Sequence, residues 1–207
     1  MRNKISQAIS VLMHPIFMPL LTLKLILFLS PISFVLMSPY INFITNMVVL
    51  TTIILPVLII IMLKLNNKVN SFEMKSIEER PLPLFFSGVS MLTGYIIIYP
   101  LISMFEIIKI TFFCAILIIF VSSLISKYWK ISLHMLGVGG LTGVVLGVHF
   151  LVDSNISILI FLLILSGILG SARLCLRAHN NLQVYLGFCL GCIVEFTGLL
   201  FLIWFYF

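Results

Sequence analysis

Apolar stretches long enough to cross a lipid bilayer follow one another along almost the whole chain. A helix needs about 20 mainly apolar residues to span a hydrocarbon core about 30 Å thick. Of the 207 residues, 62% are hydrophobic and only 9% are charged, a balance that does not suit the surface of a water-soluble domain. We therefore expect one all-α domain, a polytopic transmembrane bundle of six or seven helices, with spans near residues 16–37, 41–63, 84–101, 110–126, 135–152, 156–170 and 184–206.

The basic residues gather on one side of these expected spans. If the spans alternate in direction, the N-terminal segment and loops 64–83, 127–134 and 171–183 share a face that carries ten of the 12 Lys and Arg residues. The positive-inside rule then predicts that this face is cytoplasmic, in what we expect to be a bacterial inner membrane. Six basic residues remain there when the site candidates Arg80, Lys130, Arg173 and Arg177 are set aside, so the bias does not depend on them.

The first loop on this face ends with Arg80-Pro81, and Lys75 lies five residues before the arginine. A guanidinium group can form paired hydrogen bonds with two phosphate oxygens, which makes Arg80 a candidate phosphate ligand. For Arg80 taken alone, a topological anchor flanked by acidic residues is the simpler interpretation.

The second loop contains Lys130, Ser132, Leu133 and His134 directly before a glycine-rich stretch. We expect Ser132 to cap the following helix, whose first amides would then face an anion. His134 is placed to donate a proton to a leaving oxygen. The alternative is an ordinary helix start beside a Lys-Trp belt, and the glycines indicate close packing between helices.

The third loop contains Arg173, His179 six residues later, and Gln183 one helical turn beyond the histidine. An imidazole held through one nitrogen can attack phosphorus with the other, while an arginine stabilises charge on the phosphoryl oxygens. The alternative is a hydrated loop with two basic anchors. A histidine on each of two loops and an arginine on each of two, all on one face, favour a site for an anion.

Together, these residues resemble the three motifs of the type-2 phosphatidic acid phosphatase superfamily, the membrane relatives of the vanadium haloperoxidases. The motifs are Lys followed by Arg-Pro, Ser-Gly-His, and Arg-x5-His-x3-Asp. Arg80-Pro81 corresponds to the first, Ser132-Leu133-His134 to the second, and Arg173, His179 and Gln183 to the third. The chain is similar in particular to small membrane members from Bacteroidetes, and the resemblance extends from about residue 14 to residue 191.

The resemblance implies His179 as a nucleophile that forms a phosphohistidine, and His134 as the general acid. It implies that phosphate is bound by Arg80, Arg173, Ser132 and the amide of Leu133, with Lys130 and Lys75 as further contacts. No metal and no other cofactor is implied. Four departures bear on activity. Glu73 lies where the family has its lysine, Leu133 replaces the glycine, and Gln183 replaces the aspartate that orients the nucleophile. In addition, two extra apolar runs separate the first and second motifs, where many relatives have one loop.

The expected function is hydrolysis of a lipid phosphate or a prenyl diphosphate, with lipid substrate and membrane lipids as partners and no nucleic acid. Relatives often act from the outer side of the membrane, which leaves the orientation open, and the oligomeric state is open as well. One alternative is a catalytically degenerate protein that binds or transports anionic lipid. The other is a multispan transporter whose loop cations are only topological anchors. Glu195, about 18 Å below Gln183 by helical rise, cannot reach the loops; it is either a functional intramembrane acid or a protonated or hydroxyl-bonded glutamate.

Overall fold

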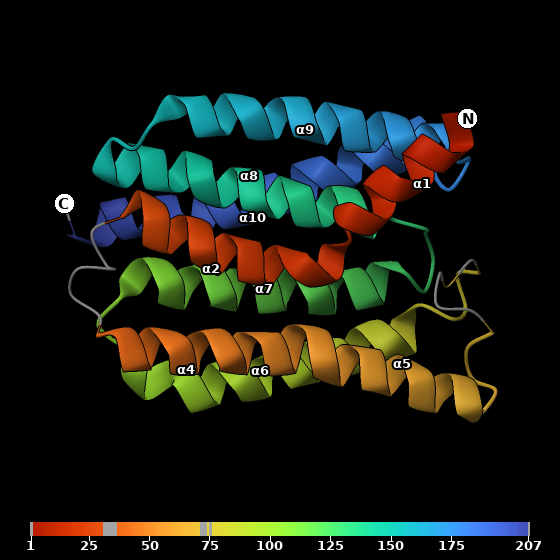
Figure 1. Cartoon of the computed structure of the whole chain (residues 1–207), viewed down its shortest axis with the longest axis horizontal. Helices are drawn as coiled ribbons and strands as arrows, with labels where there is room; N and C mark the ends of the chain where they lie inside the picture. Colours follow the sequence, from red (N-terminus) through yellow and green to blue (C-terminus); the bar gives the residue numbers. More distant parts are fainter. Residues whose placement is uncertain (1, 31–36, 71–73, 75, 207) are drawn as a thin grey trace.

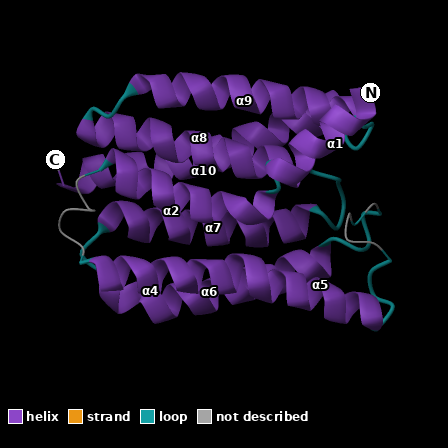
Figure 2. Ribbon diagram, in the orientation of Figure 1, coloured by secondary structure: helices purple, strands orange, loops and turns teal. Residues whose placement is uncertain are grey.

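The computed structural model describes residues 2–30, 37–70, 74 and 76–206, and this part of the chain consists of helices and loops without a strand (Figures 1 and 2). Seven helical segments are long and apolar enough to cross a membrane. The prediction of an all-α chain with about seven candidate spans is therefore confirmed. The elements are α1 (Arg2–Leu12), η1 (Pro15–Phe17), α2 (Met18–Leu29), α4 (Ser38–Val49), η2 (Leu50–Ile54), α5 (Leu55–Leu65), α6 (Pro81–Ile102), α7 (Glu106–Ile125), α8 (Leu133–Val152), α9 (Ile156–Cys175) and α10 (Asn181–Tyr206).

The first span differs from its predicted bounds of 16–37. It consists of α1 and α2, joined by the turn η1, and the apolar segment runs from Asn3 to Leu29. The prediction was misled because α1 carries polar residues and is followed by His14-Pro15, which looks like a helix start. The His14 side chain does cap η1, since its Nδ1 accepts a hydrogen bond from the Ile16 amide at 3.3 Å. Residues 31–36 of the predicted span lie outside the described residues.

The second and sixth spans are longer than the apolar runs alone suggest. A π-helical segment, η2, precedes Pro56, and the helix continues through it into α5. Proline has no backbone N–H, so it leaves one carbonyl of the helix without a donor. A local π turn is one of the ways in which a membrane helix satisfies that carbonyl. Helix α9 continues to Cys175 rather than ending at residue 170, so it has the full length of a spanning helix.

Helices α8 and α10 form the closest pair in the bundle, because glycines on each let the two backbones meet. A Cβ atom on Gly139 would lie 2.2 Å from the carbonyl oxygen of Phe188, and one on Gly191 would lie 2.1 Å from that of Leu136. The predicted role of the glycine-rich stretch in helix packing is confirmed. Where α8 begins, the Ser132 amide donates to the carbonyl of Gln183 at 3.3 Å, so the starts of α8 and α10 are held together.

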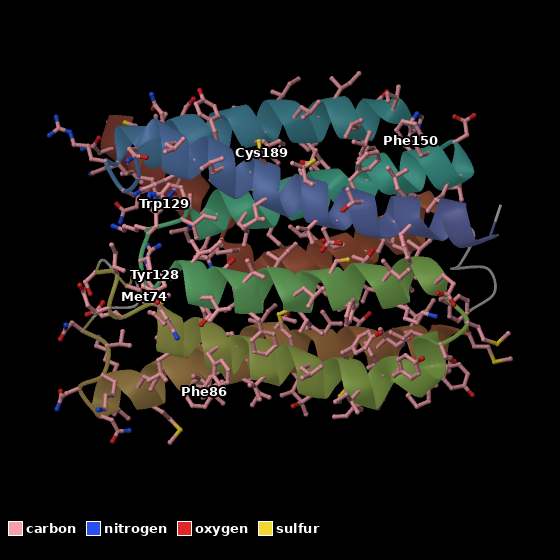
Figure 3. The ribbon with its side chains drawn as sticks, turned by 180° about the vertical axis from the view of Figure 1, so that it is seen from behind. Met74, Phe86, Tyr128, Trp129, Phe150 and Cys189 are labelled. Carbon is pink, nitrogen blue, oxygen red and sulfur yellow. The ribbon has the colours of Figure 1, made fainter. Side chains whose placement is uncertain are left out.

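The polar loops gather at the two ends of the bundle, as the alternation of spans predicts. The N-terminus, the α5–α6 loop, the α7–α8 loop and the α9–α10 loop lie at one end, which is on the right in Figure 1. In the reverse view, Met74, Tyr128 and Trp129 mark this end and Phe150 marks the other (Figure 3). All three motif-bearing loops therefore meet at one end, which we call the motif end.

Candidate functional site

Arg80 joins two of the three motif loops at the motif end. It is only 5% exposed, its Nε donates to the Met74 carbonyl at 3.0 Å, and its Nη1 donates to the Ile131 carbonyl at 2.9 Å. Burial, and after it the charge of Arg173, lowers the pKa of Arg80 to about 10, so the guanidinium remains charged at neutral pH. Arg80 thus brings a cation into the interior of this end and ties the α5–α6 loop to the α7–α8 loop.

The residue before Arg80 holds the α5–α6 loop in place. Glu79 is buried, and its Oε1 accepts hydrogen bonds from the backbone amide of Asn70 at 3.0 Å and from the Asn70 side chain at 2.6 Å. Met74, whose carbonyl receives Arg80, has a left-handed backbone with φ of 44°. The candidate ligand Lys75 lies outside the described residues.

Ser132 does not cap α8 in the way that the sequence suggested. It occupies the N-cap position, but its side chain makes no capping hydrogen bond, so this part of the prediction is wrong. The Ser132 residue is fully buried, and its Oγ has no hydrogen-bond partner within the described structure. Buried hydroxyl groups normally have a partner, so Ser132 keeps hydrogen-bonding capacity that the described structure does not use.

His134 contacts the first span rather than standing free in its loop. Its Nε2 lies 3.0 Å from the carbonyl oxygen of Ser10, and because a carbonyl only accepts, Nε2 carries the proton. The His134 ring also packs edge-on against His14, with ring centroids 5.2 Å apart. Nδ1 of His134 is consequently the nitrogen that can exchange a proton with a ligand.

His14 is the site residue that sequence reasoning missed. It was interpreted only as the start of a span, because the preceding helix α1 was not expected and nothing then brought residue 14 towards the second motif. In the structure, α1 packs against α9, and its end carries His14 to His134. A histidine followed by proline just before the predicted first span was the one available indication.

His179 is held in a defined tautomer by the start of α10. The backbone amide of Asn180 donates to Oε1 of Gln183 at 3.2 Å, which identifies this atom as the acceptor oxygen. Nδ1 of His179 lies 3.1 Å from the same oxygen. Nδ1 must therefore donate, which leaves Nε2 of a neutral imidazole with its lone pair free. In return, the backbone amide of Gln183 donates to Oδ1 of Asn180 at 2.9 Å.

The charge state of His179 follows from its surroundings. The residue is 8% exposed, and burial is the main cause that lowers its pKa to about 4. The Gln183 hydrogen bond opposes this shift, whereas the charges of Arg80, Arg173 and Lys130 add to it. The imidazole is thus neutral at pH 7, which is the form that can act as a nucleophile.

Arg173 carries a charge that acts on residues of all three motifs. It lies in the last turn of α9 and is half-buried, and its charge acts on five groups: His14, Arg80, Lys130, His134 and His179. Burial, followed by Arg80 and Arg173, lowers the pKa of the half-buried Lys130. We refer to Arg80, Lys130 and Arg173 as the cationic cluster, and His134 and His179 lie within reach of its charges.

The helix directions reinforce the positive potential at this end. Helices α6, α8 and α10 all begin at the motif end, directly after Arg80, Ser132 and Asn180. A helix N-terminus presents free amides and a partial positive charge that favour an anion. Within the described residues, no group of three or more His, Cys, Asp or Glu side chains is arranged to hold a metal ion. The chemistry available at this end is anion binding together with one neutral, oriented imidazole.

An apolar cavity of about 160 Å³ opens beside the cationic cluster and extends into the bundle. His14, Met74 and Leu133 line the part near the cluster, and Glu195 of α10 lines the deep part. Leu133, predicted to offer a backbone amide to phosphate, thus also forms part of the cavity wall.

In comparisons with known proteins, the chain matches no family model, no curated protein and no solved structure.

Proposed function

We propose that the motif end binds the phosphate group of a membrane lipid and hydrolyses its ester or diphosphate bond through a phosphohistidine on His179. Under this proposal, the helical bundle has the core of the type-2 phosphatidic acid phosphatase superfamily. The observation that carries it is the His179–Gln183 hydrogen bond, which leaves a neutral imidazole with a free Nε2 beside Arg80, Arg173 and Lys130.

In the first step, Nε2 of His179 attacks phosphorus, and the bond from phosphorus to the leaving oxygen breaks. Arg80 and Arg173 stabilise the charge on the remaining phosphoryl oxygens. The leaving oxygen takes a proton from Nδ1 of His134, which must first be protonated there against the cost of its burial and the charge of Arg173, while Nε2 stays bonded to the Ser10 carbonyl. In the second step, water gives a proton to His134 and attacks the phosphohistidine, which releases phosphate and restores His179.

The lipid nature of the substrate is inferred from the site's surroundings. The cluster lies at the ends of seven apolar helices, and the cavity beside it is lined mainly by apolar residues. A phosphate held by the cluster would leave its hydrocarbon part in the bundle or the bilayer. The setting that we propose is a bacterial inner membrane, with the motif end on the cytoplasmic side by its excess of basic residues.

Binding of anionic lipid without hydrolysis is the second candidate function, and two observations favour it. Gln183 is neutral, so it stabilises a charged imidazole far less than the aspartate of the motif would. Arg80 already donates to two backbone carbonyls, which reduces the number of its hydrogen bonds available to phosphate. Both functions need the same cationic cluster, and they differ in whether phosphorus is transferred to His179.

The deciding experiment measures phosphate release from a panel of lipid monophosphates and diphosphates by the purified protein in detergent without added metal. We expect turnover by the wild type and a loss of about 10³-fold or more in His179→Ala, since the nucleophile is removed. Arg177→Ala, which changes an exposed arginine of the same loop, is the matched control. A phosphoryl group trapped on residue 179 after rapid denaturation would support the covalent step.

Folded protein that binds anionic lipid but turns over none of the panel would favour the binding function. Full activity in both His134→Ala and His179→Ala would overturn the phosphohistidine mechanism.

A further inference from the structure

The apolar cavity contains polar atoms at a depth where nothing in the described structure satisfies them. Its walls near the cluster end and along its length are apolar, including Met18, Met91 and Phe112. Its deep part also contains Glu195 from α10 and Thr111 from α7. Glu195 lies about 18 Å from Gln183 by the rise of α10, which is roughly half the thickness of the membrane core.

Both polar side chains are almost completely enclosed by the protein. Glu195 is 3% exposed and Thr111 is 2% exposed. Oε2 of Glu195 and Oγ1 of Thr111 are buried and have no hydrogen-bond partner among the described residues. Two such atoms in one cavity are unusual, because each unsatisfied buried polar group costs about 1–3 kcal/mol.

The fold also leaves room for Glu195 rather than filling its surroundings. A Cβ on Gly140 would lie 3.6 Å from Cγ of Glu195, so the glutamate packs across the glycine-rich face of α8. Two other hydroxyl groups that line the cavity are already engaged: Thr52 donates to the Val48 carbonyl at 2.8 Å and Ser122 donates to the Ile118 carbonyl at 2.7 Å. Among the described residues that line the cavity, the buried polar atoms without a hydrogen-bond partner are Oε2 of Glu195 and Oγ1 of Thr111.

The volume limits what can enter. The cavity measures about 160 Å³, close to the size of an engineered apolar cavity of about 150 Å³ that binds benzene. It can therefore take one short hydrocarbon segment and excludes a sterol or a pair of acyl chains. The lining runs from His14, Met74 and Leu133 near the motif end to Glu195 deep in the bundle.

We propose that this cavity binds part of a single hydrocarbon chain that carries a hydroxyl group, and that Glu195 and Thr111 hydrogen-bond that hydroxyl. The chain belongs to the phosphate amphiphile whose head lies at the cationic cluster, so the inference rests on the proposed function for the position of the head. A hydroxyl both donates and accepts, and so it satisfies the two orphaned oxygens at once. Glu195 and Thr111 then select among lipid phosphates by their chains.

The test compares two single-chain alkyl phosphonates of equal length, which bind but cannot be hydrolysed. One has a plain chain, and the other has a hydroxyl at mid-chain. Binding to the purified full-length protein in detergent is measured by titration calorimetry. We expect the hydroxylated phosphonate to bind about tenfold more tightly to the wild type, the factor that corresponds to 1.4 kcal/mol.

One variant assigns this preference to Thr111, and a second tests whether it needs a carboxyl group at position 195. Thr111→Val keeps the shape of the side chain and removes its hydrogen bond, and Glu195→Gln keeps a group that can donate and accept. We expect the preference to fall to about twofold or less in Thr111→Val and to persist in Glu195→Gln. Thr197→Val is the matched control, because the exposed Thr197 already donates to the Ile193 carbonyl at 2.7 Å, and we expect it to bind both ligands as the wild type does.

Equal affinity of the wild type for the two phosphonates would overturn the inference, and so would a preference that survives in Thr111→Val. Failure of the proposed function has a different signature, in which the hydroxyl preference is intact but no lipid phosphate is turned over. The two failures are therefore distinguishable.

Discussion

The burial of His179 predicts an acid sensitivity that can be measured without knowing the substrate. The pKa of His179 is lowered from 6.5 to about 4, chiefly by burial, so the folded protein takes up a proton there only near pH 4. An unfolded chain takes up that proton near pH 6.5. Between these values the unfolded state binds more protons, and the stability of the fold must therefore fall as the pH falls from 6.5 to 4.

The size of the effect follows from the same two values. At 1.36 kcal/mol per pKa unit, the shift corresponds to a loss of about 3 kcal/mol when the pH falls through the whole window. Water at the motif end screens part of the interaction, so we expect about 1–3 kcal/mol. The Gln183 hydrogen bond raises the pKa of His179, and Gln183→Leu is expected to lower that pKa further and extend the acid-sensitive window downwards.

The assay compares the free energy of unfolding of the wild type and His179→Asn in mixed detergent micelles between pH 7 and pH 4. Asparagine does not titrate, so the lost hydrogen bond to Gln183 adds an offset that is independent of pH. Carboxyl groups that titrate in this range are common to both proteins and cancel in the difference. We expect the variant's deficit to shrink by about 1–3 kcal/mol towards pH 4. A difference that stays constant with pH would refute the assignment of a neutral, buried His179.

Three further predictions concern the architecture. Gly139→Ala is expected to lose about 1–3 kcal/mol of stability in detergent, because its Cβ meets a backbone carbonyl, whereas Gly167→Ala, with nothing within 4 Å of its Cβ, should be neutral or slightly stabilising. Arg80→Lys is expected to lower the free energy of unfolding by about 1–3 kcal/mol, since the single nitrogen of lysine cannot occupy the separate positions of Nε and Nη1 that donate to the two backbone carbonyls. In a variant without native cysteines, a membrane-impermeant maleimide applied to intact cells should label Met104→Cys and not Asn66→Cys; the reverse pattern would contradict the cytoplasmic orientation of the motif end.

The sequence predicted the spans well because bilayer thickness constrains the length of every apolar run. It also predicted that three loops would meet, since the alternation of spans assigns each loop to an end. The first span was the exception: α1 is held partly by packing against α9, a tertiary contact that hydropathy does not reveal. His14 was missed for the same reason, because its place beside His134 depends on where α1 ends.

The details of the candidate site were predictable only where they are local. The pairing of His179 with Gln183 follows from their separation by one helical turn, and the structure places them 3.1 Å apart. The N-cap expectation for Ser132 failed although it was also local, because Ser132 occupies the N-cap position but its buried side chain makes no capping hydrogen bond. Hydrogen bonds between loops, such as that from Arg80 to Ile131, have no counterpart in sequence spacing.

The glycine packing of α8 against α10 has a consequence for the proposed chemistry. The two helices begin at Leu133 and Asn181, directly after the second and third motifs, and their backbones are in contact because both carry glycines. The backbone amide of Ser132 donates to the backbone carbonyl of Gln183. The side chain of the same glutamine orients His179. A shift of α8 against α10 would therefore move the nucleophile and the phosphate-binding loop relative to each other. Gly191→Ala, which forces such a shift, should impair a site that transfers phosphorus more than one that only binds an anion, because transfer depends on alignment of the attacking atom and binding depends mainly on charge.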